Sequence, residues 1–251
     1  MSDKHWKADV LLAGDWRGAT TVLLSNGHRR MLVDTGMSHN SHQVLAALAE
    51  RGLEPDKIDV VISTHFHIDH VLNNCLFEQS QFYATQQSYE WCCAMYHDIQ
   101  NESNWRQLVL KYYPETLEYE RADQMMGKLR NLAMRWWDVD RLGPVSRYHW
   151  LEKEGLPDGM DFFITHGHVP GHASLLLEGT EQPIVIAGDA LMTRDAGQFV
   201  LTMIPQNRCQ AQADRGRVLA LKGLIIPGHD RPFVHNGAVV ATGCAPAAAE
   251  M

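Results

Sequence analysis

The chain has 251 residues, of which 45% are hydrophobic and 21% charged, so it has the size and composition of one globular domain that buries its own core. Its formal charge of −8 argues against a nucleic-acid-binding surface, because contact with phosphates needs clustered Lys and Arg. The start MSDKHWKADV lacks the apolar segment of a signal peptide, and no later apolar run is long enough to span a bilayer. We therefore expect a cytoplasmic protein that binds neither nucleic acid nor membrane.

The first third of the chain predicts short strands separated by turns. The apolar runs KADVLLAG, TTVLLSNG and RRMLVDTG each end at Gly or near Asn-Gly, which is typical of an antiparallel meander. Residues 41–51 then place apolar side chains at helical spacing, and Gly52 marks the end of that helix. The β-branched run IDVVIST predicts a buried strand that leads into the sequence THFHIDH.

Residues 86–148 differ in composition from the rest of the chain, with helical stretches rich in Trp, Tyr and Met. We interpret them as a helical insertion that lies over the core. After it, MDFFITHG, ASLLLEG, PIVIAGD, GLIIPGHD and PFVHNGAVV return to strand patterns, with a helix expected at 210–221. The two halves predict two sheets packed face to face with helices outside. The small-residue tail, 241–251, is a candidate for disorder.

The cysteine count gives no sign of a disulfide framework, whereas the histidine count suggests metal binding. Five cysteines without Cys-x-x-Cys spacing form an odd number, which suits free thiols in a reducing compartment. Fourteen histidines are many for a chain of this length, and His is the commonest metal-binding side chain. The histidines therefore call for a search for ligand spacing.

The densest group of potential ligands directly follows the strand IDVVIST. His65, His67, Asp69 and His70 all lie within the segment HFHIDH. Two His separated by one residue can project to one side of an extended turn, while the next Asp-His pair projects to the other. A lone His-x-His is more often a pair of hydrogen-bonded imidazoles, but four ligands at this spacing favour two adjacent metal ions.

The stretch THFHIDHVLNN resembles the signature of the metallo-β-lactamase superfamily. Four further segments occur in the order used by that superfamily: VDTG at 33–36, THGHVPGHASLL at 165–176, IAGDA at 186–190 and IPGHD at 226–230. The resemblance covers nearly the whole chain. It implies a single α/β domain, 1–251, with the αββα sandwich fold and the helical insertion 86–148 after the His-x-His-x-Asp-His motif.

The same resemblance implies seven ligands shared between two ions. Asp189 follows the apolar run PIVIAG, and in dinuclear hydrolases of the family this carboxylate bridges both ions. The other ligands divide into a first set of His65, His67 and His168 and a second set of Asp69, His70 and His229.

Three histidines in THGHVPGH compete for one ligand position, and the family register selects His168. His172 is then expected beside the ligands, with a ligand role still open, and His166 near the site without binding. Asp34 in VDTG resembles a position that supports the metal loops, and a turn with Gly36 is the alternative explanation for it.

Two divalent ions about 3.5–4 Å apart can share a water, lower its pKa and hold it as a bridging hydroxide, while one ion polarises the scissile bond. We assign Asp69 a second, catalytic role, in which it accepts a hydrogen bond from this hydroxide and passes the proton to the leaving group. Imidazole and carboxylate ligands favour zinc, with iron or manganese as alternatives. We expect a hydrolase that cleaves an ester, lactone, thioester or similar bond.

Individual residues narrow the substrate only in part. No Cys stands at a ligand position, and Asp189 occurs where antibiotic-hydrolysing members lack a bridging carboxylate, so β-lactamase activity is disfavoured. Acyl-homoserine lactonases usually carry a substrate-contacting Tyr where this chain has Met192, so this activity loses support. Glyoxalase II enzymes carry a glutathione-binding region after the last ligand His, and few residues follow His229, so glutathione thioesters are not expected as substrates.

Aromatic residues of the insertion favour an apolar or aromatic small-molecule substrate, because helices over a metal cleft are natural places for an apolar pocket. The alternative is that they pack the helices onto the core or form the face of a homodimer. They are Trp91, Trp105, Tyr112, Tyr113, Trp136 and Trp137.

Other classes of function stay open at this point. An iron-dependent dioxygenase of the same fold uses an overlapping ligand set, and a phosphodiesterase uses the same two-metal chemistry. Flavin-linked electron-transfer relatives are disfavoured, because they carry Glu in place of His67 and a fused flavin domain. A non-catalytic scaffold is disfavoured because all seven ligands are present.

Overall fold

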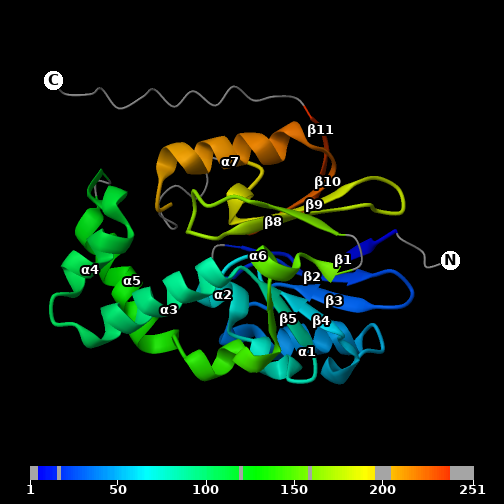
Figure 1. Cartoon of the computed structure of the whole chain (residues 1–251), viewed down its shortest axis with the longest axis horizontal. Helices are drawn as coiled ribbons and strands as arrows, with labels where there is room; N and C mark the ends of the chain where they lie inside the picture. The colour runs from blue at the N-terminus through cyan, green and yellow to red at the C-terminus, as the bar shows by residue number, and fades with distance from the viewer. Residues whose placement is uncertain (1–4, 16–17, 119–120, 158–159, 196–204, 238–251) are drawn as a thin grey trace.

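The computed structural model describes residues 5–15, 18–118, 121–157, 160–195 and 205–237. Within these ranges two β-sheets pack face to face, and helices cover both outer faces (Figure 1). The predicted αββα sandwich is therefore confirmed. The two sheets correspond to the two halves of the chain, as the grouping of strand patterns indicated.

The first sheet has six strands in sequence order, β1-β2-β3-β4-β5-β6. The meander β1-β2-β3 is antiparallel, as predicted, and β3, β4, β5 and β6 run parallel to one another. The strands are β1 (Lys7–Leu12), β2 (Thr21–Ser25), β3 (Arg30–Val33), β4 (Val60–Ile62), β5 (Gln81–Ala84) and β6 (Tyr148–Trp150).

The second sheet has five strands in the order β11-β10-β9-β8-β7. Its neighbours are antiparallel except for β9 and β10, which run parallel. Its strands are β7 (Asp161–Ile164), β8 (Ala173–Leu177), β9 (Ile184–Gly188), β10 (Lys222–Pro227) and β11 (Phe233–Asn236).

Helices α1 and α3 cover the outer face of the first sheet, and α7 covers that of the second. Helices α3, α4 and α5 lie in the chain between β5 and β6, where helices were predicted, and gather at one end of the sandwich (Figure 1). The α-helices are α1 (Ser41–Ala49), α2 (Ile68–Val71), α3 (Gln86–Asn101), α4 (Trp105–Tyr112), α5 (Ala122–Trp136), α6 (Leu151–Glu154) and α7 (Arg208–Ala220).

The alternation of side chains along the strands explains why the core has separate layers. In β2, Val22 and Leu24 belong to the cluster between the sheets, whereas Leu23 packs with residues of α1 and α3. In β9, Ile186 faces the first sheet and Val185 packs under α7. Both faces of β2 and β9 are thus buried, which is why these two runs are apolar almost throughout.

Two findings differ from the sequence-based expectations. Strand β6 lies at the end of the expected insertion, where no strand was predicted, because a three-residue strand leaves almost no periodicity to detect. The expectation of free thiols is wrong at Cys209, which is disulfide-bonded, whereas Cys75, Cys92 and Cys93 are free.

Two further expectations concern membranes and the tail. Across the described ranges, no helix combines the length and apolar character needed to cross a bilayer. The tail 241–251 lies outside the described residues.

Candidate metal centre

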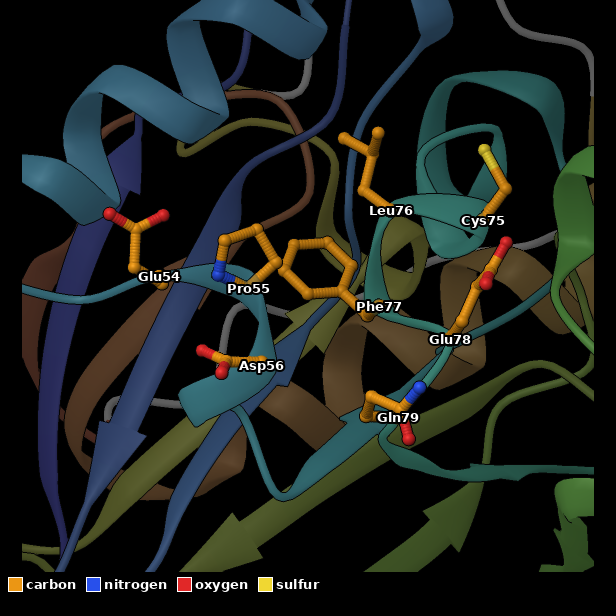
Figure 2. Close-up of a pocket in the computed structure, with 8 residues that line it drawn as sticks. All are labelled: Glu54, Pro55, Asp56, Cys75, Leu76, Phe77, Glu78 and Gln79. Atoms are coloured by element: carbon orange, nitrogen blue, oxygen red, sulfur yellow. The ribbon is translucent and has the colours of Figure 1, made fainter.

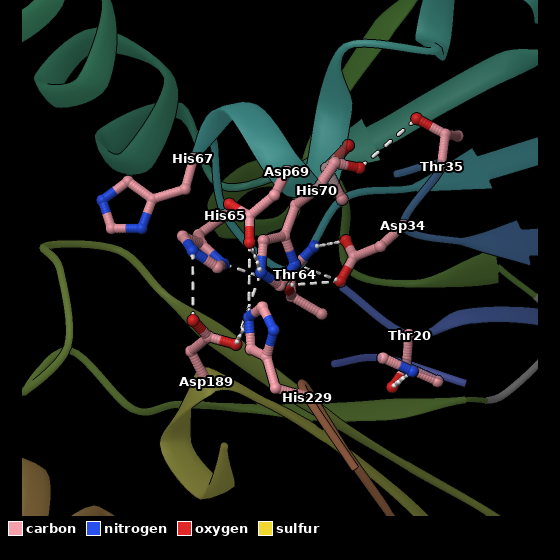
Figure 3. Close-up of polar contacts among 12 residues, drawn as sticks. Thr20, Asp34, Thr35, Thr64, His65, His67, Asp69, His70, Asp189 and His229 are labelled. Atoms are coloured by element: carbon pink, nitrogen blue, oxygen red, sulfur yellow. Dashed lines mark hydrogen bonds and ion pairs between the residues drawn. The ribbon is translucent and has the colours of Figure 1, made fainter. Parts of the chain in front are cut away.

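The seven predicted ligands lie in four loops and come together in two adjoining groups. Figure 3 labels all of them except His168. The HFHIDH segment follows β4 and runs into the short helix α2. His168 lies in the loop between β7 and β8, Asp189 directly after β9, and His229 shortly after β10. The first sheet therefore supplies four of the predicted ligands and the second sheet three.

These side chains form two adjoining groups. Within each group the ligand atoms all lie within 4.8 Å of one another. The grouping matches the division between two ions that the sequence suggested, with Asp189 placed in the first group by distance. The first group is His65, His67, His168 and Asp189, and the second is Asp69, His70 and His229.

Asp189 faces both groups, one carboxylate oxygen to each. Its Oδ2 lies 3.2 Å from His168 Nε2 and 4.0 Å from His65 Nε2. Its Oδ1 lies 3.3 Å from His70 Nε2 and 3.4 Å from His229 Nε2. A carboxylate in this position can bridge two cations.

Buried polar atoms without hydrogen-bond partners concentrate at this point. Of the eight buried side-chain nitrogen and oxygen atoms in the described residues that lack a partner, five belong to the two groups. Leaving such an atom unpaired costs about 1–3 kcal/mol, so five converging atoms call for a ligand. Imidazole nitrogens and carboxylate oxygens fit a divalent cation such as zinc. The five are His65 Nε2, His70 Nε2, both carboxylate oxygens of Asp189 and His229 Nε2.

Asp34 supports the loop that carries the first four predicted ligands. Its side chain accepts hydrogen bonds from Thr64 N at 2.8 Å, Thr64 Oγ1 at 2.9 Å and His70 Nδ1 at 2.8 Å. Asp34 adopts a left-handed backbone with φ 53°, which is unusual for a residue other than Gly. These contacts agree with the supporting role and go beyond a local turn with Gly36.

Hydrogen bonds to the outward ring nitrogens leave the inward nitrogens free for a metal. His65 Nδ1 lies 3.1 Å from Thr64 Oγ1, and His229 Nδ1 lies 2.7 Å from the carbonyl oxygen of Asp15. Because the carbonyl only accepts, His229 Nδ1 carries the hydrogen and donates it. In both rings Nε2 therefore points at the cluster, the arrangement that orients metal-binding His.

His67 has the opposite orientation. Its Nε2 lies 2.8 Å from the hydroxyl of Tyr113, and its Nδ1 lies 3.0 Å from His168 Nε2. The ligand atom available to the first group is therefore Nδ1. Sequence reasoning named Tyr113 only as one of six aromatics, because no short-range pattern connects it with His67.

A family model described as the metallo-beta-lactamase superfamily matches residues 14–229. This span includes all seven predicted ligands and every strand from β2 to β10. The chain belongs to the metallo-beta-lactamase superfamily.

Three relatives show how far this superfamily likeness extends. Metallo-beta-lactamase domain-containing protein 1 of Homo sapiens is 26% identical over 218 residues, which cover 86% of this chain and 64% of that protein. The chain thus spans less than two thirds of that relative. A Thermotoga maritima protein assigned to the metallo-beta-lactamases has 21% identity and a TM-score of 0.58, with 92% and 99% of the two chains covered. AidC, a dizinc quorum-quenching lactonase, has 18% identity and a TM-score of 0.54, with 83% and 71% covered.

The other two histidines of the THGHVPGH segment take different positions in this superfamily member. His172 is fully buried, and its Nε2 accepts a hydrogen bond from the backbone N–H of Asp189 at 2.9 Å. Its Nδ1 lies 2.7 Å from Thr165 Oγ1. Both ring nitrogens are thus engaged, and His172 positions Asp189. His166 is exposed and lies outside both groups.

A buried carboxylate that the sequence did not single out holds the loop of His168. Asp214, on α7, accepts a hydrogen bond from Gly167 N at 2.9 Å and is fully buried. A Cβ on Gly167 would come within 2.1 Å of Ala211 N, so the loop lies directly on α7. An acidic residue on the inner face of a predicted helix was the available signal for Asp214.

The charges of the site favour cations in the second group. Burial lowers the pKa of His65 well below its ordinary value and that of His67 to about 4. Burial also acts to lower the pKa of His70 and His229, but the charge of Asp189 outweighs it. The pKa of His70 is raised well above its ordinary value, and that of His229 to about 9. A region that attracts protons in this way also attracts metal ions.

A separate hollow of about 430 Å³ lies between residues 54–56 and residues 75–79 (Figure 2). Glu54, Asp56 and Glu78 line it together with Pro55, Leu76 and Phe77. None of its lining residues is a predicted ligand, so this hollow does not belong to the candidate metal centre.

Proposed function

We propose that the chain is a metal-dependent hydrolase that holds two divalent ions, with zinc favoured, and cleaves an ester, lactone, thioester or similar bond in a small organic molecule. The five buried ligand atoms without hydrogen-bond partners support this proposal most directly. The first ion is assigned to His65, His67 and His168, and the second to Asp69, His70 and His229, with Asp189 between them.

When bound, two such ions lower the pKa of a water molecule and polarise the oxygen of the scissile bond. The chain supplies the geometry for this chemistry. Asp189 has a fully buried side chain and a backbone held by His172, which suits a fixed bridge. Its two oxygens keep the two groups of ligands at one spacing.

Asp69 is the proposed proton carrier. Its side chain is 16% exposed, whereas that of Asp189 is 0% exposed, so Asp69 is the carboxylate that can reach a substrate. Its Oδ2 lies 3.4 Å from His229 Nε2, beside the second group. In the proposal, Asp69 accepts the proton of the attacking water and passes it to the leaving group.

The helical segment 86–148 is the proposed cover of the substrate site, because Tyr113 reaches His67 from it. Trp91 packs edge-on against Tyr112 and Tyr113, and Tyr96 stacks on Trp137. Most of these aromatics therefore pack within the insertion, whereas the hydroxyl of Tyr113 lies 2.8 Å from His67 Nε2.

The comparisons support a class of substrate for this proposal and do not single out one bond. AidC is a lactonase, which supports a small carbonyl substrate for this chain. Met192 stands where a substrate-contacting Tyr is expected in acyl-homoserine lactonases, and its carbonyl accepts a hydrogen bond from His229 N at 2.7 Å. We therefore place acyl-homoserine lactones in the panel of substrates without singling them out.

The first experiment measures metal content by elemental analysis on chain purified without chelators. We expect two divalent ions per chain, and fewer in His168→Ala. His166→Ala is the matched control, because His166 lies two residues away in the same loop but is exposed and outside both groups. Asp69→Asn, assayed at a metal concentration at which elemental analysis still finds two ions per chain, should lower turnover of a panel of lactones, esters and thioesters by about 10²–10⁴-fold.

The outcomes separate the proposed hydrolase from its alternatives. One iron per chain with oxygen uptake would indicate a dioxygenase, and cleavage of phosphodiesters alone would indicate a phosphodiesterase. No metal in the wild type, or equal loss in His166→Ala, would refute the ligand assignment. Unchanged turnover in Asp69→Asn would refute the proton-carrier role.

A further inference from the structure

Each of four ligand histidines has its outward ring nitrogen next to a polar group of the chain. That group is a carboxylate for His70, a hydroxyl for His65 and a backbone carbonyl for His229. For His67 it is the phenol of Tyr113, at 2.8 Å. The first three partners lie in loops of the sandwich, whereas Tyr113 belongs to the helical insertion.

The environment of Tyr113 fixes its hydroxyl. The residue is 1% exposed and follows the end of α4, where its backbone N–H donates to Val109 O at 2.7 Å. Its own carbonyl accepts hydrogen bonds from Thr116 N and from Thr116 Oγ1 at 2.8 Å. The ring packs edge-on against Trp91. Contacts of both backbone and ring thus hold the phenol beside His67.

We propose that Tyr113 is a positioning residue for the first metal ion. A ligating Nδ1 must present its lone pair, and a neutral imidazole then carries its hydrogen on Nε2. The hydroxyl oxygen of Tyr113 accepts that hydrogen, which selects the ligating tautomer of His67 and the direction of its ring. This inference deepens the proposed function and rests on its metal centre.

A second attachment ties the same part of the insertion to the opposite side of the first group. The 3₁₀-helix Pro114–Glu118 follows Tyr113, and Glu115 accepts a hydrogen bond from Arg208 N at 2.8 Å, at the start of α7. The adjacent Asn207 N donates to Gly167 O at 3.0 Å, next to His168. The insertion is therefore connected to both His67 and the loop of His168, which keeps the phenol in register with the first group.

The test compares zinc binding by Tyr113→Phe and wild type, using the full chain after removal and return of metal. Competition with a chromophoric chelator should show about 10- to 100-fold weaker binding of one of the two zinc ions, with the other unchanged. The visible spectrum of the cobalt-substituted protein should change for one site. Tyr112→Phe is the matched control, because it removes a neighbouring phenol that donates to Asp98 at 2.7 Å, away from the ligands.

The inference is overturned if Tyr113→Phe binds both zinc ions as tightly as wild type, or if Tyr112→Phe weakens zinc binding equally. Thermal unfolding of both variants identifies a simple loss of fold. A wild type that binds two zinc ions but cleaves no substrate contradicts the proposed hydrolysis, while the zinc affinities still decide the role of Tyr113. A wild type that binds no zinc contradicts both.

Discussion

A histidine binds a metal ion through a ring nitrogen that carries no proton. With a pKa of about 9, His229 would carry a proton on its inward ring nitrogen near neutral pH when no metal is bound. Its Nδ1 donates to Asp15 O, so the titrating position is Nε2, the atom that faces Asp189 and Asp69. Burial acts to lower the pKa of His229, but the charge of Asp189 raises it to about 9. Metal and proton therefore compete for one nitrogen.

We predict that zinc binding near pH 7 releases at least about one proton per chain, because His229 has to lose its proton. Since the pKa lies at about 9, the apparent zinc affinity should rise as the pH increases from 7 towards 9 and then level off. Calorimetric titration in buffers of different ionisation enthalpy measures the release. A release near zero at pH 7 would contradict the prediction, and the exposed His166→Ala variant should behave like wild type.

Residues differ in how far the sequence could predict them. The clustering of the HFHIDH side chains was predictable because they are nearly contiguous and follow a recognisable strand. Spacing alone left His172 open, because both it and His168 lie in the same loop; the buried hydrogen bond to Asp189 N decides its role. Tyr113 was not predictable, since its contact with His67 depends on how a whole helical segment folds back.

At the scale of elements, the segments that follow β9 and β10 lie so close together that a side chain at Gly228 would not fit without displacing its neighbours. Gly228 N donates to Gly188 O at 3.0 Å, and Gly188 has a left-handed backbone with φ 51°. A Cβ on Gly228 would lie 2.1 Å from Asp189 Oδ1. The glycine at the end of β10 is therefore part of what allows Asp189 to stand between the two groups.

Gly228→Ala should displace the Asp189 carboxylate and lower zinc affinity by about 10-fold or more. Gly127→Ala is the control, because a Cβ at Gly127 in α5 meets nothing within 4 Å. That variant should keep its zinc and gain up to about 1 kcal/mol in the free energy of unfolding from better helix propensity. Zinc competition and urea unfolding measure the two effects. Wild-type zinc affinity in Gly228→Ala would contradict the argument.

The sequence predicted elements best where burial imposes a pattern. The apolar runs of β2, β3 and β9 were recognisable because both faces of each strand are buried. The expected helix 210–221 appears as α7, Arg208–Ala220. Strand β6 was missed because it has only three residues. Its partner β5 is separated from it in the chain by the long helical segment, so no local pattern indicates that the two pair.

At the scale of the molecule, the candidate centre lies where the two halves of the chain meet. The ligands of the HFHIDH segment follow the first sheet, and His168, Asp189 and His229 extend from the second. Ions held by both sets of ligands would connect the sheets in addition to the apolar cluster between them. Metal binding should therefore stabilise the whole sandwich.

Removal of metal by a chelator should lower the free energy of unfolding by about 2.7 kcal/mol for each ion, relative to protein with free zinc at 100 times the dissociation constant of that site. For a chain of this size that corresponds to a decrease in Tm of about 5–10 °C for each ion removed. Thermal unfolding with and without chelator checks this, and readdition of zinc should restore the Tm. An unchanged Tm after verified metal loss would contradict a centre shared by both sheets.

The parallel pairing of β5 and β6 makes the entire helical segment a crossover connection between neighbouring strands. Loop closure entropy grows slowly with length, by about 0.6 kcal/mol for each doubling, so such a connection can lengthen or shorten while the sheet is conserved. This crossover also carries Tyr113 to His67, so a change in its length would alter the surroundings of a predicted ligand while the order of the strands stays the same. The helices that pack on the first sheet would have to be kept, because they contribute to its buried core.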